Sequence, residues 1–272
     1  IGFERIEGII SLLLPETTEE LRTFLGLVGY HHLWITSYAL ETKPLYQKLT
    51  QQEPDPFIWT IPEMQQVEKL KHLLITAPVL ALPSLEQPFH FFMTVNQRVA
   101  LGVLTQGHGD YQQPVAFLSK ILDPVAHGWP ECVQSVAATA LLTEDSRKLT
   151  FGENLIVSTP HQVRTILSQK AEKCLTNSRV LKYETILLER DDLTLTTDNS
   201  LNPAAFLTGN PNQEEPEHKC LDLISYQTRV RLDLNETAFQ TGGHQFIDSS
   251  SRVIEGKRHN GYSLVVGETS QR

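Results

Sequence analysis

Acidic side chains are the groups of this sequence whose spacing best tests for hydrolytic chemistry. A two-metal hydrolytic site holds its ions roughly 4 Å apart on a cluster of carboxylates, because the attacking water and the leaving oxygen both carry charge. Three positions in the apolar centre of the chain correspond to those expected to carry carboxylate ligands. They hold Thr94 on a strand, Glu131 at the head of a helix and Pro160 after another strand. Asp110 and Asp123 lie in turn-like sequence, which explains them through turn formation and solvation. One carboxylate cannot hold two ions, so this reaction is expected to be absent.

Thiol and imidazole side chains offer a second kind of site. His218-Lys-Cys220 and His31-His32 are each isolated in the sequence, so we interpret them as surface or packing residues and not as metal ligands. Cys132, Cys174 and Cys220 are odd in number and widely spaced, which argues against a disulfide framework and favours a reducing compartment. With no secretory signal and no apolar run of the roughly 20 residues that a membrane span needs, we expect an intracellular, cytoplasmic chain.

The elements that position these side chains follow the order of the ribonuclease H fold. Short apolar runs bounded by turn formers predict strands, and apolar residues three or four positions apart predict helices. The predicted order is strands Pro88–Val95, Ala100–Gln106 and Pro114–Ser119, helix Pro130–Leu142, strand Leu155–Thr159, a helix through Leu167, helix Asn177–Leu188 and strand Leu193–Thr197. The fold class is therefore α+β or α/β, with helices on a mixed sheet.

The segments on either side of this centre indicate three further parts. Residues 1–52 are expected to form a small helical unit, in which Thr17-Thr-Glu-Glu20 is a capping box at the start of a helix. A second capping box, Thr60-Ile-Pro-Glu63, opens a helix of the central domain, which spans residues 53–197. Residues 198–243 are rich in Asn, Pro, Gly, Glu and Gln and are expected to be a flexible tether; residues 244–272 are expected to form a hairpin.

Charge weakens the case for tight nucleic-acid binding. The formal net charge of −9 opposes long-range attraction to phosphates. One basic run stands out within nineteen residues and consists of Arg164, Lys170, Lys173, Arg179 and Lys182. Such a run is more typical of a solvated helix face than of a binding surface, but it supplies the candidate nucleic-acid-binding residues of this chain.

Several motifs in sequence order carry a family resemblance. They are Leu21-Arg-Thr-Phe-Leu-Gly26, Leu33-Trp-Ile35, Pro44-Leu-Tyr46, Gly102-Val-Leu-Thr-Gln106, Pro114-Val-Ala-Phe-Leu-Ser-Lys120, Leu122-Asp-Pro-Val125 and Gly128-Trp-Pro130. Over nearly its whole length the chain resembles the Pol polyprotein of gammaretroviruses and related endogenous retroviruses. The resemblance implies, in order, the thumb of reverse transcriptase, the inactive ribonuclease H-like connection subdomain, the tether and the first hairpin of the true ribonuclease H domain.

What the resemblance implies for catalysis is mostly negative. The family's polymerase aspartates lie upstream of Ile1, and no Tyr-x-Asp-Asp sequence occurs here. Asp248 matches the family's first metal-binding aspartate of ribonuclease H, but Ser249 stands where the family has Gly, and the remaining ligands would lie beyond Arg272. Asp248 is therefore expected to be a vestigial metal ligand. No cofactor is expected for this chain, whereas the intact parent enzyme uses Mg²⁺.

Four hypotheses about the function remain open. The first is a noncatalytic fragment that binds RNA–DNA hybrid or DNA duplex weakly through its thumb helix, Thr18–Val28, and its connection surface. The second is a protein-interaction module, with self or protein association through the connection fold. An active nuclease would need ligands from another chain. An endogenous retroviral remnant without a selected function is the fourth.

Overall fold

The computed structural model describes residues 3–51, 55–169, 174–198, 202–209, 218–228, 244–254 and 257–267. The chain forms two compact units, Ile1–Thr228 and Arg229–Arg272. No helix among the described residues is both long and apolar enough to cross a lipid bilayer.

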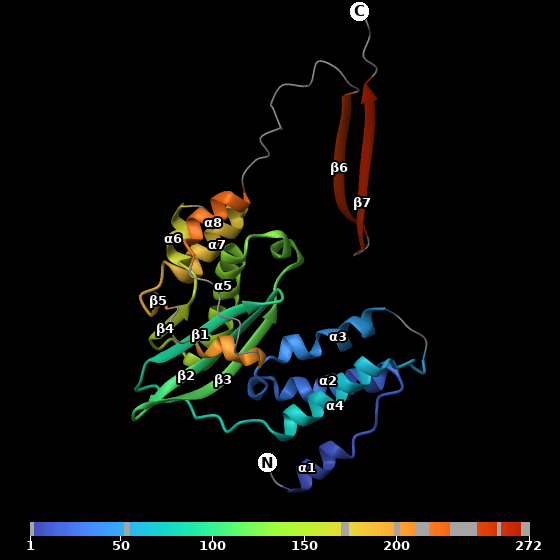
Figure 1. Ribbon diagram of the computed structural model, residues 1–272, viewed down its shortest axis with the longest axis vertical. Coiled ribbons are helices and arrows are strands. Elements are labelled where there is room, and N and C mark those ends of the chain that lie inside the picture. The colour runs from blue at the N-terminus through green and yellow to red at the C-terminus, as the bar shows by residue number, and fades with distance from the viewer. Residues whose placement is uncertain are drawn as a thin grey trace, which may run out of the picture. The chain divides into compact units, whose positions relative to one another are not determined.

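A five-stranded mixed sheet organises the first unit (Figure 1). Its strands are β1 (Phe89–Asn96), β2 (Val99–His108), β3 (Tyr111–Ile121), β4 (Leu155–Thr159) and β5 (Leu193–Thr197), in the spatial order β3-β2-β1-β4-β5. The first three strands pair antiparallel, while β4 pairs parallel to both β1 and β5. The order of these strands and of the helices between them along the chain is the one predicted from the sequence.

Tight turns explain the antiparallel half of the sheet. Gln97 and Arg98 join β1 to β2 with positive φ angles of 48° and 66°, as expected for a two-residue hairpin turn whose twist matches that of the strands. Gly109 (φ 61°) and Asp110 join β2 to β3, so Asp110 lies in a turn as predicted. Because β4 runs parallel to β1, the chain between β3 and β4 must cross over, and helix α5 (Glu131–Thr150) makes that crossing.

Alternating side chains of β2 bury both faces of the sheet. Ala100 and Leu104 belong to the main core, which contains Val133 and Val136 of α5. Val99 and Leu101 pack instead with Ala39 and, at the edge of the group, Leu207. Successive side chains of a strand point to opposite faces, so the second group lies on the face away from α5. The helices that contribute to this second group are α3 (Tyr38–Thr50) and the 3₁₀ helix η4 (Pro203–Thr208).

Four helices precede the sheet. They are α1 (Phe3–Ile10), α2 (Thr18–Tyr30), α3 and α4 (Ile61–Ile75), with a 3₁₀ turn η1 (His32–Trp34). Thr17 accepts a hydrogen bond from the Glu20 N–H at 3.2 Å, as predicted, but the Glu20 carboxylate accepts from the Glu16 N–H and not from Thr17. The second capping box is complete on the carboxylate side, since Glu63 accepts from the Thr60 N–H at 2.9 Å.

Helix α4 packs with the preceding helices. Its side chains Val67, Leu70 and Leu74 share one buried cluster with Leu21 and Phe24 of α2. A division of the chain at residue 52 would cut through this cluster, because α4 lies on the far side of that division in sequence. The division between a helical unit and a central domain at residue 52 stays a prediction, and the packing of α4 against α2 argues against it.

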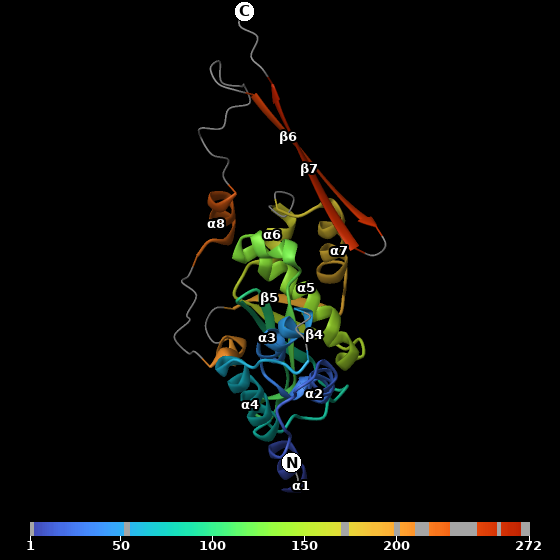
Figure 2. The ribbon, with the colours of Figure 1, turned by 90° about the vertical axis from the view of Figure 1, so that its right-hand side faces the viewer.

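Among the described residues of the first unit, three α-helices follow α5. They are α6 (Val163–Gln169), α7 (Asn177–Leu187) and α8 (Cys220–Gln227). Figures 1 and 2 show them gathered beside α5 at one end of the sheet, with α2, α3 and α4 at the opposite end. Helix α8 and η4 both lie within the expected tether, yet Ala204, Cys220 and Ile224 are buried, so these parts of it are packed. Residues 199–201, 210–217 and 229–243 of the expected tether lie outside the described residues.

The second unit contains a two-stranded antiparallel sheet of β6 (His244–Ile254) and β7 (Lys257–Gly267). The sequence predicts the strands of this hairpin over the shorter segments His244–Asp248 and Tyr262–Val266. Asp248 pairs with Ser263 in the register of this sheet, and its side chain lies outside the described part of the structure.

We predict that Gly102→Ala destabilises the sheet. A Cβ atom at Gly102 would lie 2.6 Å from a ring carbon of Phe91, which is fully buried and has little room to move. Overpacking of this kind costs about 1–3 kcal/mol. Thermal unfolding followed by circular dichroism should show a lower unfolding temperature for this variant. Gly107→Ala, on the same strand, is the control because a Cβ there meets no atom within 4 Å. Equal effects of the two changes would contradict this account.

Candidate functional site

The carboxyl ends of β1 and β4 lie side by side. The parallel register pairs Phe92 with Ser158. Thr94 lies two residues further along β1, and Pro160 lies two residues beyond Ser158, just after the end of β4. The Ser135 and Thr159 hydroxyl oxygens are 3.2 Å apart, which brings the first turns of α5 to the same end. The expected positions therefore do converge, but they present hydroxyl and proline side chains. Glu131 begins α5 and its side chain is exposed.

No carboxylate group able to hold a metal ion forms in this neighbourhood. Among the residues that the structure describes, one group of three or more His, Cys, Asp or Glu side chains converges, and it contains no Asp or Glu. The side chain of Asp248 falls outside the described residues.

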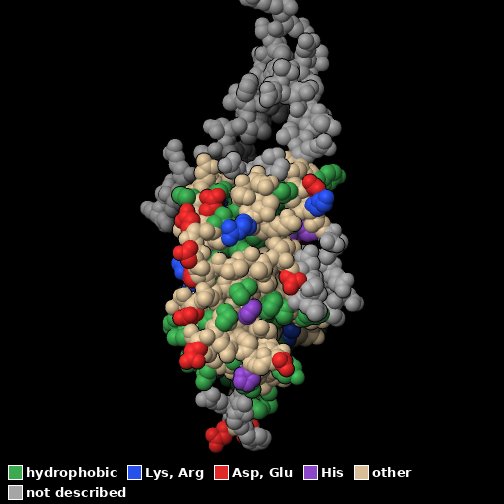
Figure 3. All heavy atoms as spheres, turned by 90° about the vertical axis from the view of Figure 1, so that its left-hand side faces the viewer, with side chains coloured by type: hydrophobic (Ala, Val, Ile, Leu, Met, Phe, Trp, Pro, Cys, Tyr) green, Lys and Arg blue, Asp and Glu red, His purple; other side chains and the backbone are tan. Residues whose placement is uncertain are grey.

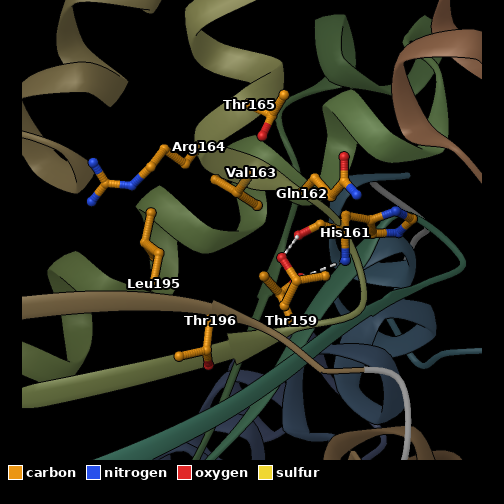
Figure 4. A pocket seen from close by; sticks show the side chains of 9 residues that line it. Thr159, His161, Gln162, Val163, Arg164, Thr165, Leu195 and Thr196 are labelled. Atoms are coloured by element: carbon orange, nitrogen blue, oxygen red, sulfur yellow. Dashed lines mark hydrogen bonds between the residues drawn. The ribbon is translucent and has the colours of Figure 1, made fainter.

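A shallow pocket of about 260 Å³ opens where β4 and β5 end and α6 begins (Figure 4). It is lined by Thr159, His161, Gln162, Val163, Arg164, Thr165, Leu195, Thr196 and Thr197. Arg164 and His161 point to opposite sides of this pocket in Figure 4, and the Thr159 hydroxyl accepts a hydrogen bond from the His161 N–H at 3.4 Å. Ligands of open α/β sheets often bind at such strand ends, but the pocket offers one exposed cation.

The predicted basic residues do not form one free surface. Arg179 donates a hydrogen bond to the Asp123 carboxylate at 2.8 Å and its guanidinium lies over the Trp129 ring, 5.2 Å from the centroid. The hydrogen bond to Asp123 raises the pKa of Arg179. Both contacts join α7 to the segment before α5. Lys182 lies 3.9 Å from Glu144. Lys170 and Lys173 lie outside the described residues.

Charges of both signs are mixed on the surface near these helices. On the face drawn in Figure 3, a few Lys and Arg side chains are scattered among Asp and Glu over the described part of the chain. Arg164 is exposed at the pocket rim. Its role as a nucleic-acid contact, like that of the other four basic residues, stays a prediction.

Helix α2 presents a second candidate surface. Leu21, Phe24, Leu25 and Val28 bury one side of the helix. The opposite side is exposed and consists of Arg22, Thr23, Gly26, Leu27 and Tyr30, with Leu27 40% and Tyr30 79% exposed. A Cβ at Gly26 would meet no atom within 4 Å. Packing within the chain therefore gives no reason for a glycine at this helical position, where it weakens the helix by about 1 kcal/mol relative to alanine.

Two thiols and two imidazoles converge in a group that the sequence patterns do not predict. Cys132 of α5, His161 after β4, and His218 and Cys220 at the start of α8 place one donor atom each within 4.8 Å of one another. His218 and Cys220 are isolated in the sequence, but the fold gives each of them partners in this group. Their partners lie far away in sequence, 86 residues in the case of Cys132 and His218, and only the fold joins them. A hydrogen bond with Cys132 and contacts with His161 lower the pKa of Cys220 to about 3, against the effect of burial.

Comparison with protein families and solved structures agrees with the observed fold. Residues 59–157 match the family described as the RNase H-like domain found in reverse transcriptase. The chain is 39% identical over 264 residues to the Gag-Pol polyprotein of avian reticuloendotheliosis virus, covering 96% of this chain and 23% of that protein. It is also 39% identical to the Pol polyprotein of feline endogenous virus ECE1, covering 97% of this chain and 25% of that protein. The chain thus spans about a quarter of the length of these relatives.

One solved structure with the same fold is a foamy viral protease–reverse transcriptase in complex with RNA/DNA hybrid. It superposes with a TM-score of 0.67 and 15% sequence identity, covering 98% of this chain and 34% of that one. A second is the same kind of enzyme in complex with dsDNA, with a TM-score of 0.66, 18% identity and coverage of 74% and 42%. At these identities the likeness concerns the fold.

We predict a pH-dependent contribution of Asp123 to stability. The Val125 N–H and then Arg179 lower the pKa of this carboxyl in the folded chain. A lowered folded-state pKa stabilises the fold above the unfolded value, about 3.9, and this contribution is lost as the pH falls through the folded pKa. Asp123→Asn keeps an acceptor for Val125 but removes the charge facing Arg179. Its unfolding temperature should be slightly lower than that of the wild type at pH 7, since exposed pairs contribute about 0–1 kcal/mol.

Thermal unfolding across a pH series checks this expectation. The difference between wild type and Asp123→Asn should shrink as the solution is acidified below about pH 4. Asp110→Asn removes the same charge at the exposed turn between β2 and β3 and serves as the control. A difference that grows in acid would contradict the assigned role of the ion pair.

Proposed function

Because this chain carries the RNase H-like domain found in reverse transcriptase and corresponds along its length to one segment of gammaretroviral Pol polyproteins, we propose that it is a duplex-binding part of such an enzyme without a complete catalytic site. Its ligand would be an RNA–DNA hybrid or a DNA duplex. The observation that carries this proposal is the exposed side of α2, which has no packing partner among the described residues and includes a glycine that the fold itself does not need.

The chemistry of this side of α2 suits a nucleic-acid backbone. Arg22 and Tyr30 offer side-chain donors of the kinds that contact phosphate and sugar oxygens, whereas the Thr23 hydroxyl already donates to the Glu19 carbonyl at 3.0 Å. Gly26 lets a ligand approach the helix backbone closely, because no side chain stands in the way. Leu27 adds an apolar contact between them. Glu19 and Glu20 at the start of the helix limit its net positive charge.

Relatives in fold support duplex as the ligand class. The foamy viral enzymes that share this fold were solved with RNA/DNA hybrid and with dsDNA. Transfer of that ligand to this chain is a proposal, because sequence identity to those enzymes is 15% and 18%. Retroviral relatives at 39% identity are far longer than this chain, so polymerase and nuclease activity belong to the parent protein in this proposal.

Affinity is expected to be weak. The net charge of −9 opposes association with phosphates, and Arg179 is already paired with Asp123. We expect dissociation constants in the non-specific range, about 10⁻⁴–10⁻⁶ M at physiological salt, with little sequence preference. Each phosphate contact should add about −0.9 to the slope of log affinity against log salt.

We predict that Gly26→Leu weakens hybrid binding while it stabilises the fold. The new side chain would project from the exposed side of α2 and keep a duplex away from the helix backbone. Removing glycine from a helix interior should raise stability by about 0.8–1 kcal/mol. Fluorescence anisotropy with a labelled RNA–DNA hybrid, measured at several salt concentrations, gives the affinity, and thermal unfolding gives the stability.

Gly8→Leu is a matched control for this experiment. Gly8 is an exposed residue of α1, and a Cβ there also meets no atom within 4 Å, so the chemical change is identical. It should raise stability without changing hybrid affinity. Equal affinities of the two variants, with clear binding by the wild type, would move the contact surface away from α2. Absence of binding even at low salt would favour a protein-interaction module instead.

We predict that the isolated chain does not cleave an RNA–DNA hybrid in Mg²⁺ or Mn²⁺. The described residues hold no converging carboxylate group, and Asp248 alone cannot hold two ions. Gel analysis of a labelled hybrid incubated with the chain tests this, and Asp248→Asn should behave like the wild type. Cleavage that the wild type shows reproducibly and Asp248→Asn lacks would mean that further ligands are supplied by another chain.

A further inference from the structure

We propose that Cys132, His161, His218 and Cys220 form a structural zinc site that fastens α8 to the sheet-and-helix core. Three separate parts of the fold supply these four side chains. Cys132 is the second residue of α5, His161 follows β4 by two residues, and the other two flank the beginning of α8. The inference goes beyond duplex binding and does not depend on it.

The distances between the donor atoms match a tetrahedral site. Zinc–sulfur bonds of about 2.3 Å and zinc–nitrogen bonds of about 2.0–2.1 Å at tetrahedral angles place neighbouring donors roughly 3.3–3.8 Å apart. Cys132 Sγ lies 3.2 Å from His218 Nε2, and Cys220 Sγ lies 3.7 Å from both His218 Nε2 and His161 Nδ1. The largest separation within the group is below 4.8 Å. Small side-chain adjustments are enough to bring all four onto one ion.

The donor set selects the kind of metal. Two thiols and two imidazoles without a carboxylate suit Zn²⁺, whereas Mg²⁺ and Ca²⁺ take oxygen ligands. Four protein donors complete the coordination shell, which is typical of structural zinc and leaves no open position for catalysis. On binding, the two thiols lose their protons to solvent and the imidazoles coordinate through neutral nitrogens.

Burial and supporting hydrogen bonds hold the donors in place. Cys132, Cys220 and His161 are 0%, 2% and 3% exposed, so the site is shielded from water. The backbone of His161 is fixed from both sides, since its N–H donates to the Thr159 hydroxyl and its carbonyl accepts from Thr197 at 3.5 Å. The rings of His161 and His218 lie 5.2 Å apart and are tilted by 54°, so the two imidazoles are direct neighbours within the group.

A role for such a site follows from the size of α8. The helix has eight residues, fewer than an isolated helix needs for stability in water. It is the last helix of the first unit, and its apolar anchor in the main core is Ile224 together with Cys220. A metal bond to α5 and to the end of β4 would close a long chain segment and hold this helix on the core.

Metal content of the purified full chain tests the proposal. The chain is prepared without a histidine tag, kept reduced, incubated with Zn²⁺ and freed of unbound metal, and its zinc is measured by mass spectrometry. We expect about one zinc per chain for the wild type, and near-complete loss in Cys220→Ser and His218→Ala. Cys174→Ser and His31→Ala are the controls, since they remove the same groups outside the cluster, and should keep the zinc.

Cobalt provides a readout of geometry on the wild type itself. Co²⁺ in place of Zn²⁺ should give the intense visible bands of a tetrahedral ion and sulfur-to-cobalt charge transfer, both absent from His218→Ala. A chelator should lower the unfolding temperature of the wild type and of Cys174→Ser but not that of His218→Ala. His218 is only partly buried, so this variant is the one least disturbed in packing.

Three results would overturn the zinc site. They are a folded, reduced wild type that takes up no zinc or cobalt; zinc retained in both Cys220→Ser and His218→Ala; and a Cys132–Cys220 disulfide in freshly prepared protein. None of these measurements involves nucleic acid, so failure here leaves duplex binding untouched, and failure of duplex binding leaves the zinc site untouched.

Discussion

The packing of α5 against the five-stranded sheet is the constraint on which the rest of the first unit depends. Because β4 must pair parallel to β1, the chain crosses from one end of the sheet to the other, and α5 fills that crossing with a nearly continuous buried surface. Its first turn thereby comes to the end of the sheet where β4 stops, as the contact between Ser135 and Thr159 records. Phe89, Phe91 and Val133 belong to the core that holds this arrangement.

The first turn of α5 and the end of β4 lie side by side, and the side chains at this place determine which ligands it can bind. At the strand ends the chain has Thr94 and Pro160, so these positions offer no carboxylate ligand for a two-metal site. His161 directly follows Pro160, Cys132 directly follows Glu131, and both belong to the thiol–imidazole group. The group has no carboxylate oxygen for a hard cation such as Mg²⁺, but its two thiols and two imidazoles are the ligands that a borderline cation such as Zn²⁺ prefers. The same crossing of the chain that would assemble a nuclease therefore assembles a thiol–imidazole cluster here.

The helices before the sheet have their own core and their own surface. Lys48, which is 2% exposed, donates to the Ile58 carbonyl and to Glu63, and its ammonium lies near the rings of Phe57 and Trp59. Such internal pairing fixes α3 against the start of α4 and leaves α2 with one side exposed. The proposed duplex contact thus depends on a helix that tertiary packing orients but does not cover.

By itself the sequence determined the local elements and the expectation that two-metal chemistry is absent. Strand and helix periodicity, the Thr17 and Thr60 caps and the turn at Asp110 are all local signals, acting over a few residues, and the structure has each of them. The absence of carboxylates was equally visible, because a residue type can be read without a fold. The resemblance to retroviral Pol polyproteins added the order of the parts.

Only the tertiary structure decided which distant residues meet. The basic residues from Arg164 to Lys182 lie close together in the sequence, but Arg179 contacts Asp123 and Trp129. These partners are about fifty residues away along the chain, so the sequence does not predict the contacts. Conversely, Cys132 and His218 are 86 residues apart and meet because α5 and α8 begin near the place where β4 ends. Packing of α4 with α2 has the same origin. Long-range contacts depend on how the buried faces of whole elements fit together, and no short pattern of residues records that fit.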